Sequence, residues 1–254
     1  MATTKKETAI ATVEENQYAV VVSGANCGEL INENLGGQFS IFDLDIVKVP
    51  AAGGIAWEIP TMEGTESSKD VTGVIIGKKR VRAYFDKPFD GSSEPPACSS
   101  NDGEIGIGDP CNSGMAGRHS CETCPMNQWG TDPNPQGSGK GKACSEKLML
   151  FILRKDELLP TVLVVPPTSL KPMRKYMLRL SGKGKAFYTV ETTFSLAKAK
   201  NATGIAYSEV VPTMSRELSP QEAEVMKTYY TGFGELLEGV TVPVEVHEQS
   251  QADE

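Results

Sequence analysis

Five of the six cysteines in this 254-residue chain lie between positions 98 and 144. Cys121 and Cys124 form a C-x-x-C pair, Cys98 precedes the pair and Cys144 follows it. Structural Zn²⁺ takes four sulfur or nitrogen ligands in a tetrahedron, and loops often supply cysteines in such pairs. Where thiols stay reduced, clustered cysteines favour a metal site over disulfides. We therefore predict that Cys98, Cys121, Cys124 and Cys144 bind a structural zinc ion.

Two other side chains compete for the place of Cys98. Cys111 lies in the turn-like segment GDPCNSG, and His119 stands two residues before Cys121, a short spacing for ligands of one ion. We favour Cys98 because, with Cys144, it would fasten both ends of the surrounding segment to its middle. The alternatives to a metal site are free buried thiols or a redox-active C-x-x-C pair. The redox interpretation is disfavoured because no βαβ pattern surrounds the pair.

The sequence shows no catalytic constellation. A catalytic zinc site keeps an open coordination position and needs a general base nearby. The nucleobase-deaminase signature, H-x-E followed by P-C-x-x-C, is absent, and His119 and His247 are the only histidines. The segment GSGKGKAC does not match a phosphate-binding loop. A metalloenzyme such as a nuclease needs a carboxylate cluster, and no such motif is recognisable. We therefore expect a binding protein and not an enzyme.

Positive charge is concentrated in the middle of the chain. Residues 72–200 hold 19 of the 25 Lys and Arg residues and 12 of the 33 Asp and Glu residues, a net charge of +7. The remaining residues hold 6 basic and 21 acidic side chains, a net charge of −15, so the whole chain carries −8. A basic centre between acidic flanks favours a polyanionic partner in spite of the negative total.

Residues 71–85, VTGVIIGKKRVRAYF, predict a long strand with apolar side chains on one face and cations with an aromatic ring on the other. Proteins that hold single strands without sequence preference combine a cationic groove with aromatic rings on which bases stack. The predicted nucleic-acid-binding residues are Lys78, Arg80, Arg82, Tyr84, Lys140, Lys142, Lys183, Lys185 and Phe187. Trp129 is expected instead to pack over the cysteine pair as an aromatic lid.

Periodic segments predict the elements that position these residues. Strands are expected at 18–24, 38–50, 54–60, 71–85, 147–154, 161–166, 185–196 and 204–212. Helices are expected at 29–36, 168–184 and 219–239. Residues 86–146 are rich in Gly, Pro, Ser, Asn and Asp and lose all apolar periodicity. So long a structureless loop is improbable in a compact domain, which is a second reason to expect a metal there.

The pattern predicts a mainly β fold with a few helices, either an OB-fold-like barrel carrying a zinc-stapled insertion or another α+β sheet. We expect a flexible segment at 1–17, one domain at 18–240 with the insertion at 86–146, and an acidic tail at 241–254. The sequence has no apolar signal-peptide core and no apolar run of membrane-spanning length. A cytoplasmic location is therefore expected, within the host cell if a phage encodes the chain.

The segments PPACSSNDG, CETCPMNQWGT, GKGKAC and LLPTVLVVPPTSLKPMRKYMLRL resemble a group of bacteriophage and prophage proteins over about residues 70–200. The resemblance implies a single-stranded DNA-binding protein of phage DNA replication or recombination. It also implies that the acidic tail recruits replication or recombination proteins, although the tail ends in QADE and not in the usual hydrophobic residue. The residues do not distinguish DNA from RNA as the ligand, and they leave open whether the protein forms a homo-oligomer. The alternative function is a zinc module that binds a host protein.

Overall fold

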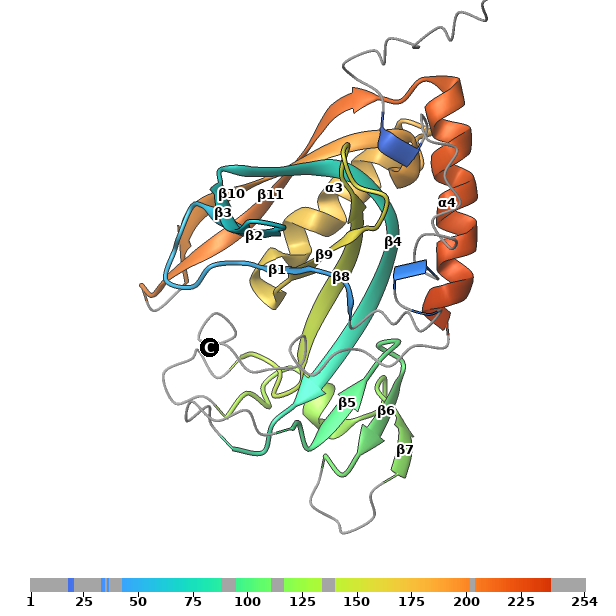
Figure 1. The fold of residues 1–254 in the computed structure, drawn as a ribbon. Helices are drawn as coiled ribbons and strands as arrows, with labels where there is room; N and C mark the ends of the chain where they lie inside the picture. The colour runs from blue at the N-terminus through green and yellow to red at the C-terminus, as the bar shows by residue number, and fades with distance from the viewer. Residues whose placement is uncertain are drawn as a thin grey trace, which may run out of the picture.

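The structure, a computed structural model, describes residues 18–20, 33, 34, 36, 43–87, 95–110, 117–133, 140–201 and 204–238. It confirms a mainly β fold with few helices and a mixed sheet (Figure 1). The strands within these ranges form an open sheet and not a closed barrel. No helix in the same part of the chain has both the length and the apolarity needed to cross a membrane.

Nine strands form the main sheet, in the order β1-β9-β8-β4-β5-β6-β7, with β10 paired to β4 and β11 paired to β10. A separate hairpin consists of β2 (Trp57–Thr61) and β3 (Gly64–Ser68). The strands of the main sheet are β1 (Ile46–Lys48), β4 (Asp70–Tyr84), β5 (Cys98–Ser100), β6 (Ile105–Gly108), β7 (Gly117–Ser120), β8 (Ser145–Leu153), β9 (Thr161–Val165), β10 (Val190–Lys200) and β11 (Ala206–Glu217).

The 15-residue strand β4 is the branch point of the sheet. One of its edges pairs with β8 from Val74 to Ala83. Its other edge pairs with β10 over residues 70–74 and with β5 over residues 82–84. Between these two pairings the 3-10 helix η4 (Phe187–Thr189), which directly precedes β10, lies in contact with β4. The cysteine-rich region is therefore attached to the rest of the sheet at the neighbouring ends of β4 and β8.

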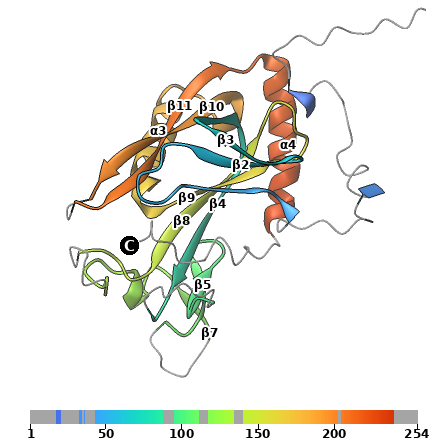
Figure 2. The same ribbon diagram turned by 60° about the vertical axis from the view of Figure 1, so that its left-hand side comes forward.

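Two helices cover the two faces of the sheet (Figures 1 and 2). Helix α4 (Pro220–Glu238) contributes Met226 to one buried cluster, which also holds Phe151 of β8. Helix α3 (Leu170–Gly182), which follows the 3-10 helix η3 (Pro167–Ser169), contributes Met173 and Leu180 to the other cluster. Strands β8 and β9 each supply side chains to both clusters, so both faces of these two strands are buried. This explains why the sequence of each strand is a continuous apolar run.

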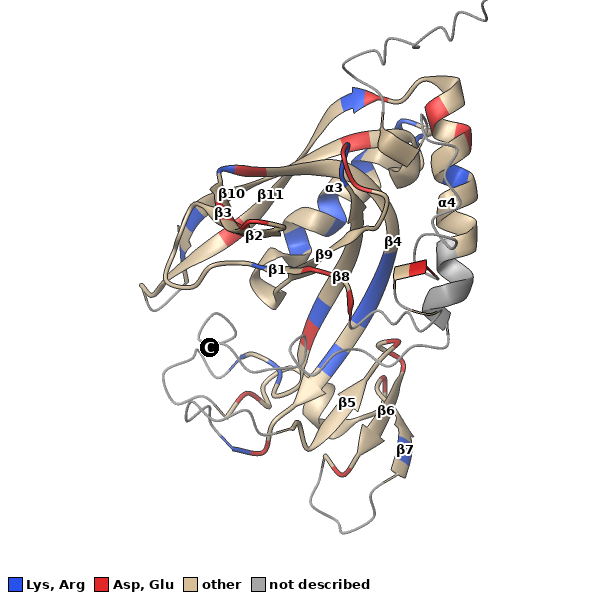
Figure 3. Cartoon of the chain, viewed as in Figure 1, with Lys and Arg blue, Asp and Glu red and all other residues tan. Residues whose placement is uncertain are grey.

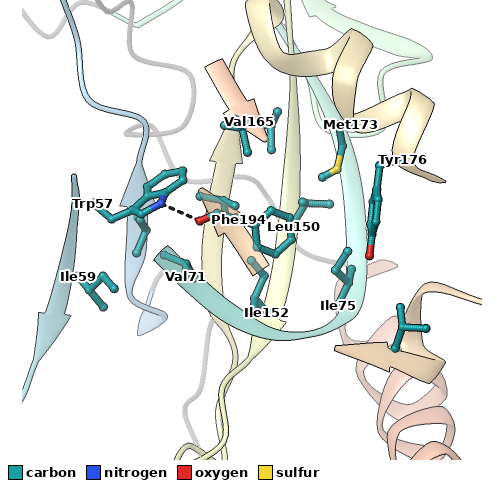
Figure 4. Close-up of a cluster of buried hydrophobic side chains, with 14 of the residues drawn as sticks. Trp57, Ile59, Val71, Ile75, Leu150, Ile152, Val165, Met173, Tyr176 and Phe194 are labelled. Atoms are coloured by element: carbon teal, nitrogen blue, oxygen red, sulfur yellow. Dashed lines mark hydrogen bonds between the residues drawn. The ribbon is translucent and has the colours of Figure 1, made fainter. Parts of the chain in front are cut away.

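The cluster under α3 is anchored by Trp57, whose indole is fully buried and donates a hydrogen bond from Nε1 to the Phe194 carbonyl oxygen at 2.9 Å (Figure 4). Tyr176 lies on the same side of α3 as Met173 and Leu180 and is buried, with its hydroxyl 2.7 Å from Thr192 Oγ1. This hydrogen bond links the β2–β3 hairpin to β10. Breaking it would leave the buried indole N–H without an acceptor, which costs free energy.

Most predicted elements of the second half are confirmed, and several of the first half are not. Strands β4, β8, β9, β10 and β11 and helices α3 and α4 match the expected segments within a few residues. Ala19 and Val20 are helical and not extended. Within 43–50, the described part of the strand expected at 38–50, only residues 46–48 form a strand. Strand β3 was not predicted, because its sequence GTESS carries no apolar alternation and all but one of its residues are exposed. The predicted segments at 1–17 and 241–254 lie outside the described residues.

A network of buried charges joins the start of the described chain to α4. Arg216 of β11 binds both carboxylate oxygens of Glu222, at 3.0 and 2.7 Å. Its Nε lies 3.4 Å from Glu191 Oε2, which also accepts a 2.8 Å hydrogen bond from the Tyr18 hydroxyl. Glu222 further accepts the Ser219 backbone N–H at 2.8 Å, forming a capping box at the start of α4.

This network predicts a defined loss of stability in acid. The hydrogen bonds from Arg216 hold the pKa of Glu222 at about 2, against an ordinary value of 4.5. Because the folded-state pKa is depressed, Glu222 stabilises the protein above pH 4.5, and the stabilisation is lost as the pH falls toward 2. We expect Glu222→Gln to cost about 3 kcal/mol at pH 7, with the difference from wild type shrinking between pH 4.5 and 2. Urea unfolding of both proteins at several pH values measures it.

The control for this prediction is Glu224→Gln, which removes an exposed carboxylate from the same turn of α4. It should leave the free energy of unfolding within a few tenths of a kcal/mol of wild type. A Glu222→Gln deficit that stays constant down to pH 2 would contradict the assignment of the ion pair.

Candidate nucleic-acid interface and metal site

The cysteine-rich region is more ordered than the sequence predicts. We call residues 95–110, 117–133 and 140–146 the cysteine lobe. Three short strands of this lobe extend the main sheet from the end of β4, and the 3-10 helix η2 (Pro125–Asn127) follows the C-x-x-C pair. The sequence does not predict these strands because they are only three or four residues long and contain Gly and Ser.

All four predicted zinc ligands lie buried in this lobe and are free of disulfides. Burial, and then the charges of Cys121, Cys98 and Cys124, raise the pKa of Cys144 to about 12, and only Arg82 opposes them. The Cys98 Sγ lies 3.4 Å from His119 Nε2, so two of the predicted ligand candidates are neighbours. The alternative ligand Cys111 lies outside the described residues.

The donor set is chemically suited to zinc, but the thiols do not converge on one point. In the described ranges no three His, Cys, Asp or Glu side chains are close enough to hold a metal ion as they stand. Buried thiols in a shared environment, with no disulfide and with an arginine beside them, are the ligand type that zinc takes in structural sites. The backbone supports the group, since Cys144 N–H donates to the Met126 carbonyl at 2.8 Å and brings the last cysteine beside the C-x-x-C loop.

Arg82 is the buried cation at the base of this lobe, which corrects its prediction as a solvent-facing residue. The residue is only 9% exposed. Its Nε donates to the Gly103 carbonyl at 2.9 Å, and one terminal nitrogen donates to Asn127 Oδ1 at 2.5 Å. The other terminal nitrogen lies 2.5 Å from Glu146 Oε2. Asn127 in turn donates to the Cys121 carbonyl at 2.6 Å. Arg82 therefore fixes the position of the cysteine loop and is not available to an external ligand.

Lys78 and Phe187 form the first cation–aromatic pair of the interface. The Lys78 Nζ lies 5.6 Å from the centre of the Phe187 ring, within the range of a cation–π contact. The pair forms because η4 occupies the edge of β4 between β10 and β5. The Phe187 ring also meets Tyr188 and Tyr230 edge to face, at 5.5 and 5.4 Å between ring centres. All three rings are partly exposed, so a patch of aromatic surface lies beside an exposed lysine.

Trp129 and Lys142 form the second such pair, and the prediction that Trp129 acts as a lid is wrong. The Trp129 side chain is 78% exposed. Lys142 Nζ lies 5.1 Å from its ring centre and donates to Asn127 Oδ1 at 3.2 Å, the oxygen that also binds Arg82. The small lobe is closed by Asn127 and the Arg82 network, so the indole is left on the surface.

The other predicted residues fall into two groups. Lys140 and Lys183 are exposed, and Arg80 has an exposed side chain at 3.4 Å from Glu146. Lys185 is held by Glu217 at 2.6 Å, and Tyr84 is half-buried opposite Cys98. The structure thus brings Lys78 and Arg80 to one surface with Phe187, while it uses Arg82 in a buried ion pair and Lys185 in an ion pair with the exposed Glu217.

Sequence reasoning missed Tyr188 and Tyr230 as members of the aromatic patch. Alternation along the expected strand at 185–196 would place Tyr188 in the core, and Tyr188 does pack against the cluster that holds Phe151, but η4 also brings its ring against Phe187. Tyr230 stacks on Tyr188 at 5.0 Å although it lies on α4, and no sequence pattern signals such a contact. In comparisons with protein-family models, curated proteins and solved structures, none matches this chain.

Proposed function

We propose that this protein binds single-stranded DNA through the surface that carries Lys78, Arg80, Phe187, Lys142 and Trp129. The observation that supports it most is the presence of two cation–ring pairs near the two ends of one stretch of β4: the exposed Lys78 with Phe187, and the half-buried Lys142 with the exposed Trp129. Lys78 lies at one end, and Arg82, four residues on, contacts the Asn127 side chain that also binds Lys142. Four residues of strand span about 13 Å.

This arrangement matches what non-specific single-strand binding requires. Phosphates are attracted by Lys78, Arg80 and Lys142, while bases stack on rings without regard to sequence. We also propose that the scaffold is OB-fold-like and that β4 is the strand that faces the nucleic acid. The proposed zinc ion would be structural: Cys98, Cys121, Cys124 and Cys144 would hold it, and it would fix the lobe that presents Trp129.

We expect Trp129→Ala to weaken binding to a labelled oligonucleotide of about 20 nucleotides by roughly 5- to 150-fold, since base–aromatic stacking contributes about 1–3 kcal/mol. Fluorescence anisotropy at two salt concentrations measures the dissociation constant. The matched control is Met62→Ala, which removes another fully exposed large side chain, at the tip of the β2–β3 hairpin. The control should bind as wild type does.

The double variant Lys78→Gln/Arg80→Gln tests the cationic part of the surface, with Lys69→Gln/Lys227→Gln as the control of equal charge. Both control lysines are exposed. Only the first pair should lower the affinity and flatten its salt dependence. If wild type binds no single-stranded oligonucleotide at low salt, the proposed function is rejected and the alternative of a host-protein-binding module is favoured. Single-stranded RNA and duplex DNA of equal length establish the preferred nucleic acid.

A further inference from the structure

Helix α3 is rich in Lys and Arg residues (Figure 3). Met173, Tyr176 and Leu180 are buried against the sheet, which leaves the opposite side of the helix in solvent. Residues three and four positions apart lie above one another on a helix. The exposed cations of α3 are Lys171, Arg174, Lys175 and Arg179.

These four cations have no acidic partner among the described residues. Helix α3 contains no acidic residue. None of the four side chains forms an ion pair with a described residue, whereas Arg80, Arg82, Lys185 and Arg216 are all held by glutamates. Four uncompensated charges on a rigid helix about 20 Å long form a strong and extended positive potential.

These cations are continuous with the proposed interface. Lys183 caps the C-terminus of α3, and Gly184 follows with a φ of 69°, a left-handed conformation that glycine adopts without strain. This turn leads the chain within three residues to Phe187 and its partner Lys78. Lys78 and Arg80 stand opposite Leu150 and Leu148, which pack in the same cluster as the buried side of α3. Helix α3 and the two β4 cations therefore lie on the same side of the sheet.

We infer that the outward side of α3 is a phosphate-binding extension of the interface, and this inference rests on the proposed function. The backbone of a single strand whose bases stack at Phe187 would continue along Lys183, Arg179, Lys175 and Lys171. The exposed side of α3 carries cations and no aromatic ring. Such a surface is suited to binding the phosphates of the backbone, which requires positive charge, and offers no ring on which a base could stack. The partner is thus a single strand long enough to reach from the aromatic patch to the start of α3.

The test is the variant Lys171→Gln/Arg174→Gln/Lys175→Gln/Arg179→Gln, because glutamine keeps a high helix propensity. Each phosphate contact with a single strand contributes about 0.7 to the slope of log K against log salt. Four lost contacts lower the slope by about 3, so between 50 and 200 mM salt wild type loses about 50-fold more affinity than the variant. The control of equal charge is Lys69→Gln/Lys198→Gln/Lys200→Gln/Lys227→Gln, from exposed sites on other elements. Circular dichroism and the melting temperature show whether both variants are folded.

Oligonucleotide length separates this inference from the proposed function. A 20- to 30-nucleotide strand should discriminate wild type from the α3 variant, while a strand of a few nucleotides should bind both equally at the aromatic patch. If wild type binds long strands and the folded α3 variant has the same slope as the control, the extension along α3 is wrong although the interface stands. If wild type binds no strand of any length, the proposed function itself fails.

Discussion

Replacing Arg82 with methionine is expected to destabilise the protein by about 3–5 kcal/mol, the cost of leaving a buried partner of an ion pair uncompensated. Methionine approximates the length of the side chain but offers no donor. Glu146, the Gly103 carbonyl and Asn127 Oδ1 would each lose the hydrogen bond or ion pair that they now make. Because Asn127 also binds the Cys121 carbonyl, the C-x-x-C loop would lose its attachment to β4.

Arg80→Met is the matched control for this prediction. Arg80 lies two residues away on the same strand and shares Glu146, but its side chain is 53% exposed and its ion pair measures 3.4 Å. A solvent-exposed pair contributes about 0–1 kcal/mol, so Arg80→Met should remain close to wild type. Urea unfolding gives the free energies, and hydrogen exchange locates the loss within the cysteine lobe. Equal losses in the two variants would show that the buried network does not hold the lobe.

Chelation of zinc is expected to unfold the cysteine lobe while the sheet between α3 and α4 remains folded. The lobe contributes no side chain to the two buried clusters that support the main sheet, so little apolar packing stabilises it. Binding of structural zinc supplies about 10–16 kcal/mol to small domains of this kind. We expect one zinc ion per chain by elemental analysis, and loss of the metal together with hydrogen-exchange protection in the lobe on treatment with a strong chelator.

Single cysteine variants identify the ligands. Cys124→Ser should lower the zinc content well below one per chain, whereas Cys27→Ser, at the one cysteine outside positions 98–144, should not. Comparing Cys98→Ser, Cys111→Ser and His119→Ala decides which of the three completes the site. A protein that is purified without zinc and melts identically with and without chelator would overturn the metal assignment.

The sequence by itself determined the periodic elements and the identity of the buried thiols. Strand β4 and helices α3 and α4 follow from apolar repeats of 2 and 3.6 residues that persist over many positions. The spacing of Cys121, Cys124 and Cys144 likewise predicts a shared metal site, and the structure confirms that these three thiols are buried. These sequence patterns involve residues close together in the chain, so they can be recognised without knowledge of the fold.

Only the tertiary structure decided which charges and rings remain at the surface. Alternation along β4 places Lys78, Arg80 and Arg82 on one face, but only the strands that pack at its end show that Arg82 becomes buried while Lys78 stays exposed. Trp129 is exposed because Asn127 and Arg82 already close the lobe, and Tyr230 reaches the aromatic patch from a helix more than 40 residues beyond Phe187. Burial depends on contacts between residues far apart in the chain, and those contacts are set by how the sheet branches at β4.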